Sequence, residues 1–290
     1  MSSKARYFPV SPKPLKMSAG LHRFGTDFGQ GARDQQFFQL DSERGRYLAE
    51  KRAAPLRRRV LVDGDAGAAE ARGAALAWMR STLALEAPHV LVEAARDTGA
   101  RDELDALARA LPEDFCVLCA GVNDAGSTAL IDVRFPSGWR PERLAGADFE
   151  HIHRPVPGFP GTARAAQSMV RTMVERGPFV RFVWTMCPED RLDQHPEVRS
   201  SSRWDGAHDV WLRVERQITV PLPAARSSLF LIRVYHYRWD ELTTEQHAVL
   251  RTALAEVPEE LRIYKSLPTI PELDAALARA QREARHGRFG

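Results

Sequence analysis

Apolar residues recur at helical spacing in the first part of the chain. Steps of three and four residues, with capping residues and breakers at the ends, predict helices over residues 41–54, 65–85 and 99–111. The same signals predict later helices over residues 162–176, from residue 243 onward, and over residues 271–285. Thr243 and Gln246 have the spacing of a capping box. Residues 1–40 are expected to be irregular, because prolines and glycines are frequent there.

The pattern changes its period after Pro112. Segments rich in Val, Ile, Phe, Tyr and Trp predict strands over residues 115–119, 129–135, 179–186, 210–220 and 229–237. Helices followed by a run of strands indicate the α+β class. We therefore expect one domain over residues 1–290, with an antiparallel sheet of about five strands flanked by helices and a C-terminal helix within residues 266–290.

Composition narrows the class of protein. Hydrophobic residues make up 44% of the 290 residues and charged residues 27%, which excludes a fully disordered or collagen-like chain. The net charge of +3, from 41 basic and 38 acidic residues, is too balanced to indicate a nucleic-acid partner. We also expect no membrane partner, because no apolar run approaches the length of a span. Three cysteines and the lack of a secretory signal favour a cytoplasmic protein.

Two histidines form the first candidate site. His151 and His153 precede Pro155 and Pro157, and these prolines predict a stiff, extended segment. In an extended segment both imidazoles share one face, and neutral imidazole is a common ligand of iron, zinc and copper. The alternative is a pair of loop histidines with ordinary hydrogen bonds. Cys116-x-x-Cys119 resembles half of a zinc site, but two thiols at this spacing in a strand face opposite sides.

Two arginines interrupt apolar strand faces. Arg216 shares its face with Leu212, Val214 and Ile218, and Arg233 shares its face with Leu231. A buried cation needs an anion, so each arginine is expected to meet an acidic partner or a ligand carboxylate. The alternative for Arg216 is a solvated Arg–Glu ladder on an edge strand.

Two aromatic residues are candidates for contact with a ligand. Tyr235 could donate to a ligand or to a backbone carbonyl. Trp139 ends a tight turn, where it could form a pocket wall or simply pack. The chain has no phosphate-binding loop, no GxGxxG and no GxSxG. The residues alone therefore indicate an α+β protein with a histidine-ligated cofactor.

Four short segments, in order, resemble the heme-dependent oxidative N-demethylase family. They are Phe-Pro-Ser-Gly-Trp at 135–139, His-Ile-His-Arg-Pro-Val-Pro at 151–157, Leu-Arg-Val-Glu-Arg-Gln at 212–217 and Phe-Leu-Ile-Arg-Val-Tyr at 230–235. The resemblance implies a PAS-like sheet that encloses heme b. It implies a histidine axial ligand, which is placed at His153 with His151 as the substitute. It also implies oxygen-dependent oxidation of nitrogen-bearing substrates.

The resemblance assigns roles to the other candidates. Arg216 and Arg233 are expected to hold heme propionates or a substrate carboxylate, and Tyr235 and Trp139 to contact the cofactor. Glu215 is expected to be the catalytic acidic contact to a cationic substrate nitrogen. The implied partners are a small cationic amino acid or amine, dioxygen or peroxide, and an external electron donor.

One departure from the family pattern concerns substrate choice. Where the family often has Arg-x-Asn-Trp, residues 181–184 are Arg-Phe-Val-Trp, so Val183 replaces an amide. The short form is similar to a branch from a D-cycloserine pathway that N-hydroxylates L-arginine. The expected function is therefore that of a heme monooxygenase that hydroxylates L-arginine in antibiotic biosynthesis. The alternatives are oxidative N-demethylation of a small methylamine and a heme-PAS sensor of gas or redox state.

Overall fold

A single antiparallel sheet organises the computed structural model, which describes residues 3–12, 20–62, 65–121, 124–144, 146–159, 163–198, 204, 207 and 209–286. The strand order is β1-β5-β6-β7-β3-β4-β2. The strands are β1 His22–Arg23, β2 Arg59–Leu61, β3 Asp114–Cys119, β4 Ser127–Asp132, β5 Phe179–Cys187, β6 Trp211–Leu222 and β7 Ser227–Arg238.

The five expected strands correspond to β3 to β7, but the described sheet has seven strands. The two additional strands, β1 and β2, lie at the two edges of the sheet. β1 has two residues and β2 has three, so neither is long enough to show an alternating pattern. β6 and β7 have twelve residues each and pair along their whole length. These two long central strands therefore carry most of the sheet.

The described helices are α1 Arg44–Ala53, α2 Ala66–Glu86, α3 Pro88–Ala95, α4 Glu103–Ala110, α5 Phe149–His153, α6 Ala163–Glu175, α7 Thr244–Glu256, α8 Glu259–Lys265 and α9 Ile270–His286. The capping box of Thr243 and Gln246 is confirmed at the start of α7. Three short helices, α3, α5 and α8, were not expected, because one or two turns show too little periodicity. The expected cap at Thr162 lies outside the described residues.

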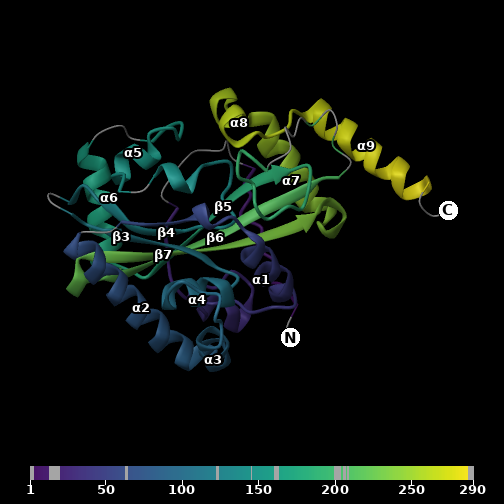
Figure 1. Ribbon diagram of the computed structural model, residues 1–290. Helices are drawn as coiled ribbons and strands as arrows, with labels where there is room; N and C mark the ends of the chain where they lie inside the picture. The colour runs from purple at the N-terminus through teal and green to yellow at the C-terminus, as the bar shows by residue number, and fades with distance from the viewer. Residues whose placement is uncertain are drawn as a thin grey trace.

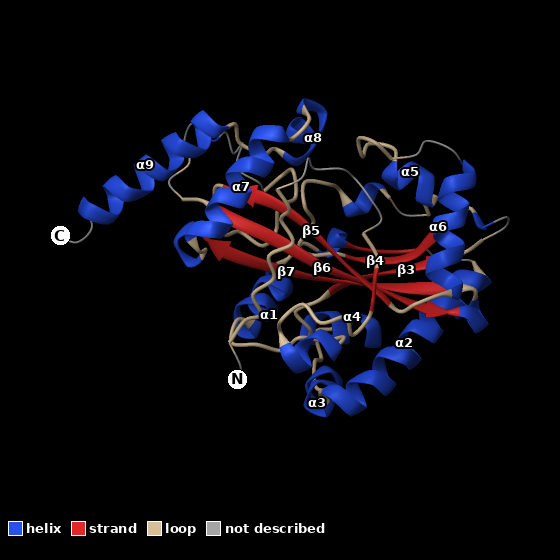
Figure 2. Ribbon diagram, turned by 180° about the vertical axis from the view of Figure 1, so that it is seen from behind, coloured by secondary structure: helices blue, strands red, loops and turns tan. Residues whose placement is uncertain are grey.

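The two faces of the sheet differ in chemistry. Strand register places Val214, Arg216 and Ile218 on one face, which we call the core face. Arg213, Glu215 and Gln217 point to the other, which we call the Glu215 face. Figure 1 and Figure 2 show α1 to α4 on one side of the sheet, and α5, α6 and α8 on the opposite side.

Packing identifies which helices cover which face. Ala71, Ala75 and Met79 of α2 pack with Ile218 against the core face. α5 and α6 pack on Leu118 at one end of the Glu215 face, through Phe149 and Val170. Within the described residues, no helix is long and apolar enough to cross a membrane.

Candidate functional site

The segment with the two histidines is helical, so the expectation of an extended segment is wrong. The Asp148 carboxylate accepts a hydrogen bond from the backbone N–H of His151 and caps α5, and the prolines follow only after the helix. In a helix, residues two apart point about 200° from each other. His151 is exposed and His153 is half-buried, so the two imidazoles do not share a face.

His153 is held as a metal ligand would be. Its Nδ1 lies 2.8 Å from the carbonyl oxygen of Phe149. A carbonyl only accepts, so Nδ1 carries the proton and the lone pair is on Nε2. No described residue binds Nε2. The ring packs between Phe149 and Phe159, with ring centroids 4.0 Å and 5.4 Å away. Burial, together with the positive charge of Arg181, lowers the pKa of His153, which keeps the imidazole neutral.

Glu215 lies near the middle of β6 and its carboxylate is fixed by neighbours on the same face. The Ser137 hydroxyl donates to Oε1, and the Gln217 amide donates to Oε2 at 2.9 Å. The Nε of Arg213 lies 3.7 Å from Oε1. The side chain is half-buried, so the carboxylate is fixed in direction and still within reach of a ligand. Ser137 belongs to the turn before Trp139, and the strand pattern gave no sign that it would reach Glu215.

Three further charged or polar residues gather around Glu215. Arg181 lies on β5 two residues before Val183, which pairs with Glu215, and Arg181 itself pairs with Gln217. Burial lowers the pKa of Lys265 to about 8, against the opposing charge of Glu215. Burial and the charge of Glu215 raise the pKa of Tyr264. Sequence reasoning did not assign these three residues. The alternation of β5 was the one available signal, since it places Arg181 and Val183 on one face.

Gln217 and Phe230 are half-buried although they lie on interior strands, and Val183 is half-buried on β5, which pairs with β1 only at Phe179 and Val180. Trp139 is also half-buried and packs against Ile131 beside them. Interior strand positions are usually covered completely, so partial exposure here indicates surface available to a ligand. We call these four residues, with His153, Glu215 and Arg181, the Glu215 site.

Arg216, Arg233 and Tyr235 lie on the other face of the sheet. Arg233 is 1% exposed, and its guanidinium lies 3.0 Å from the Asp41 carboxylate and 3.9 Å from the ring centre of Tyr47. The expected buried anion is confirmed for Arg233, and it comes from the protein itself.

Arg216 meets a different kind of partner. It is 2% exposed and donates to the backbone carbonyl of Gln36 at 2.8 Å. β6 is an interior strand, so the alternative of a solvated edge ladder is wrong. Tyr235 donates to the side-chain oxygen of Gln39 rather than to a backbone carbonyl.

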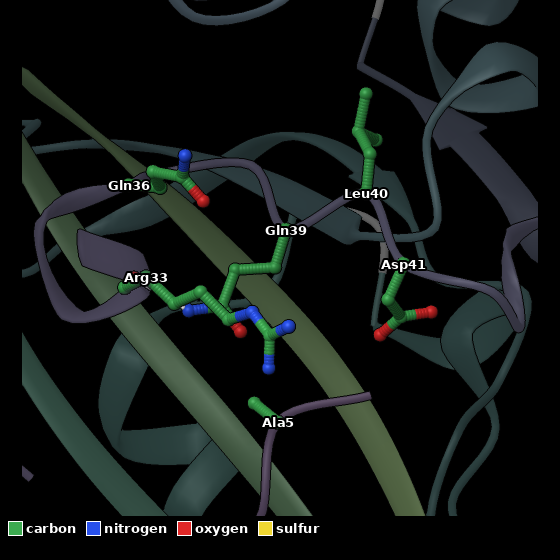
Figure 3. Close-up of a pocket in the computed structure, with 6 residues that line it drawn as sticks. All are labelled: Ala5, Arg33, Gln36, Gln39, Leu40 and Asp41. Atoms are coloured by element: carbon green, nitrogen blue, oxygen red, sulfur yellow. Dashed lines mark hydrogen bonds between the residues drawn. The ribbon is translucent and has the colours of Figure 1, made fainter. Parts of the chain in front are cut away.

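A small pocket lies beside this cluster, and Figure 3 shows the residues that line it: Ala5, Arg33, Gln36, Gln39, Leu40 and Asp41. Its cavity volume is about 10 Å³, which is about the space of a single water molecule. Gln39 and Asp41 are already bonded to Tyr235 and Arg233. This pocket therefore offers little room for a large cofactor.

The structure places His153, Glu215 and Trp139 on one side of the sheet, and Arg216, Arg233 and Tyr235 on the other. The expectation that all six surround one cofactor fails because alternate residues of a strand point to opposite faces. His151 also lies on α5, but its side chain points to a different side of the helix from that of His153.

The cysteines do not form half of a metal site. Cys116 packs beside Trp139 and Ile131, whereas Cys119 lies over Gly67 of α2, 3.8 Å from its carbonyl oxygen. Burial raises the pKa of the Cys116 thiol. No group of three or more His, Cys, Asp and Glu residues that could hold a metal ion occurs within the described ranges. A heme iron needs only one protein ligand of this kind.

Comparison with protein families gives one match. A family model described as haem-dependent oxidative N-demethylase, alpha subunit-like, matches residues 72–272. The matched segment includes His153, Arg181 and Glu215. No curated protein matches the chain.

Proposed function

The chain belongs to the haem-dependent oxidative N-demethylase, alpha subunit-like family, and we propose that it oxidises a nitrogen of a small cationic substrate with heme b bound at the Glu215 site. The observation that carries this proposal is the Nε2 of His153, which binds no described residue and lies in a neutral, oriented imidazole on the same side of the sheet as Glu215. We also propose that the sheet is PAS-like.

His153 would supply the axial nitrogen. Its Nδ1–H bond to Phe149 fixes the ring and the tautomer, as hydrogen bonds behind metal-binding histidines commonly do. Trp139 and Phe230 would provide apolar contact for the porphyrin. The core face would contribute through Arg216, Arg233 and Tyr235, which would stabilise the strands that carry Glu215. When bound, heme supplies the oxygen chemistry, and the protein supplies orientation and charge.

Glu215 would hold the cationic nitrogen of the substrate. Ser137 and Gln217 fix both carboxylate oxygens, so the group does not need to reorient when the substrate binds. Tyr264 is 45% exposed and close enough to Glu215 for the two to interact electrostatically. It would cover the substrate and exclude water.

Two substrates fit this arrangement. Oxidative N-demethylation of a small methylamine requires a cation site only, and the family description supports it. N-hydroxylation of L-arginine also requires a site for the carboxylate, and Arg181, which pairs with no described residue and has a buried Nε without a hydrogen bond, favours it. Either reaction takes electrons from an external donor with dioxygen, or uses peroxide.

Heme binding is tested by titrating purified protein with hemin. His153→Ala should lose or strongly shift the Soret band, because it removes the axial nitrogen, whereas His151→Ala should keep the wild-type spectrum. Loss of the band in His151→Ala alone would move the ligand to His151. A wild-type protein without a Soret band would overturn the proposed function.

The reaction is tested by product analysis. The holoprotein is supplied with reductant or peroxide, and with L-arginine or methylated amines. Formaldehyde identifies demethylation, and hydroxyarginine identifies hydroxylation. Glu215→Gln should weaken substrate binding more than heme binding, because it removes the charge and keeps the shape. Neither product, with reversible binding of oxygen or carbon monoxide, would favour a sensor instead.

A further inference from the structure

Arg181 is a half-buried cation without a partner among the residues that the structure describes. Its Nε is buried and makes no hydrogen bond, and no described residue forms an ion pair with its guanidinium. Burial lowers the pKa of Arg181, and only the charge of Glu215 opposes this effect. An unsatisfied buried donor of a charged group is unfavourable, and native proteins seldom keep one without a reason.

Other arginines on the neighbouring strands have at least one described partner. Arg213 donates to the carbonyl oxygens of Leu192 and Phe135, both at 2.9 Å. Arg233 is paired with Asp41, although its Nε and Nη1 make no hydrogen bond within the described chain. Arg181 differs from both, because its guanidinium meets neither a described acceptor nor a described carboxylate.

Glu215 does not satisfy Arg181 either. Both of its oxygens accept bonds from Ser137 and Gln217, and it lies in the field of Lys265 as well as of Arg181. With Arg213, whose Nε lies 3.7 Å from Oε1, three cations share this one carboxylate, which leaves a local excess of positive charge. The excess lies beside His153, whose pKa the charge of Arg181 also lowers.

We propose that Arg181 binds a carboxylate of a bound ligand, with the guanidinium forming the paired hydrogen bonds that carboxylates accept. This inference rests on the proposed function. The carboxylate belongs either to a heme propionate or to an amino-acid substrate. A propionate places Arg181 at the edge of the heme, and a substrate carboxylate makes Arg181 the residue that distinguishes amino acids from simple amines.

Hemin titration tests whether the carboxylate that Arg181 binds is a heme propionate. Arg181→Gln and wild type are titrated with hemin and with hemin dimethyl ester, whose propionates carry no charge. A propionate contact predicts that Arg181→Gln weakens hemin binding at least tenfold and changes binding of the ester little. Arg181→Lys should give an intermediate affinity, because it keeps the charge and loses the fork. Arg171→Gln removes an exposed charge from α6 and should bind both forms as wild type does.

Substrate titration tests whether the carboxylate that Arg181 binds belongs to an amino-acid substrate. Holoprotein is titrated with L-arginine and with agmatine, which lacks the carboxylate, and binding is followed by the shift of the Soret band. A substrate contact predicts that Arg181→Gln weakens L-arginine binding at least tenfold and leaves agmatine binding unchanged.

Thermal melting of the heme-free protein separates this role from a structural one. Arg181→Gln should melt at the same temperature as wild type or higher, since it removes an unpaired buried cation. A clear drop in melting temperature, or unchanged affinity for hemin and L-arginine in a wild-type background that binds hemin, would overturn the inference alone. Absence of a Soret band in wild type would overturn the proposed function as well.

Discussion

At the scale of single residues, buried charges need partners, and the partners lie far away in the sequence. Arg233 and Asp41 are separated by 192 residues and meet in the interior. The positively charged guanidinium of Arg233 also lies over the face of the Tyr47 ring, which is a favourable cation–π contact. A strand pattern shows that such a residue needs an anion, but it does not show which carboxylate will be present.

Asp41→Asn should lower the free energy of unfolding by about 3–5 kcal/mol, because it leaves Arg233 charged and buried without its anion. Urea denaturation monitored by circular dichroism measures the change. Asp240→Asn breaks the exposed pair with Arg238 and should change the same free energy by about 0–1 kcal/mol. Equal losses in the two variants would show that the buried pair contributes no more than a surface pair.

At the scale of elements, helix α5 determines the orientation of the His153 side chain. Five residues form this helix, and its start depends on the Asp148 cap. A helix this short has little stability of its own. Packing of Phe149 on the α6 side chains holds it against the sheet. The hydrogen bond from His153 to Phe149 spans one helical turn, so it exists only while α5 is formed.

Asp148→Ala should therefore weaken hemin binding as well as stability, because loss of the cap frays the helix that orients His153. Loss of an N-cap typically costs about 1 kcal/mol. Thr243→Ala removes a comparable cap from α7 and should lower stability by a similar amount with unchanged hemin affinity. Hemin titration and denaturation of both variants make the comparison. Equal hemin affinity in the two would contradict this role for α5.

At the scale of the whole molecule, the sheet separates the core face from the Glu215 face, where we propose that the ligand binds. α1 to α4 close the core face, whereas half-buried residues remain on the interior strands of the other face (Figure 1, Figure 2). The separation lets charged groups such as Arg181 stay available without weakening the main core.

Hydrogen exchange on hemin binding tests this separation. Amides of α5, α6 and β5 should exchange more slowly in the holoprotein, and amides of α2 to α4 should change little. His153→Ala treated with hemin is the control, and it should show no protection. Protection centred on residues 36–41 and α2 would place the heme on the core face, beside Arg216 and Arg233.

The sequence by itself determined the long elements and their chemistry. Periodicity located β3 to β7 and most of the longer helices, and the capping box set the start of α7, because these signals are local. The alternation of β6 also placed Arg216 on an apolar face, with a solvated edge ladder as the alternative to burial. The family resemblance, carried by short motifs in order, is borne out by the match over residues 72–272.

Only the tertiary structure decided which of these residues meet. Segments far apart supply Asp41 to Arg233 and Ser137 to Glu215. Strand register places Val183 of β5 opposite Glu215 of β6. The edge strands and α5 were missed because their stability comes from packing and capping rather than from a long pattern. Periodicity reports local preference, whereas charge pairing, burial and an unpaired guanidinium depend on how distant segments pack.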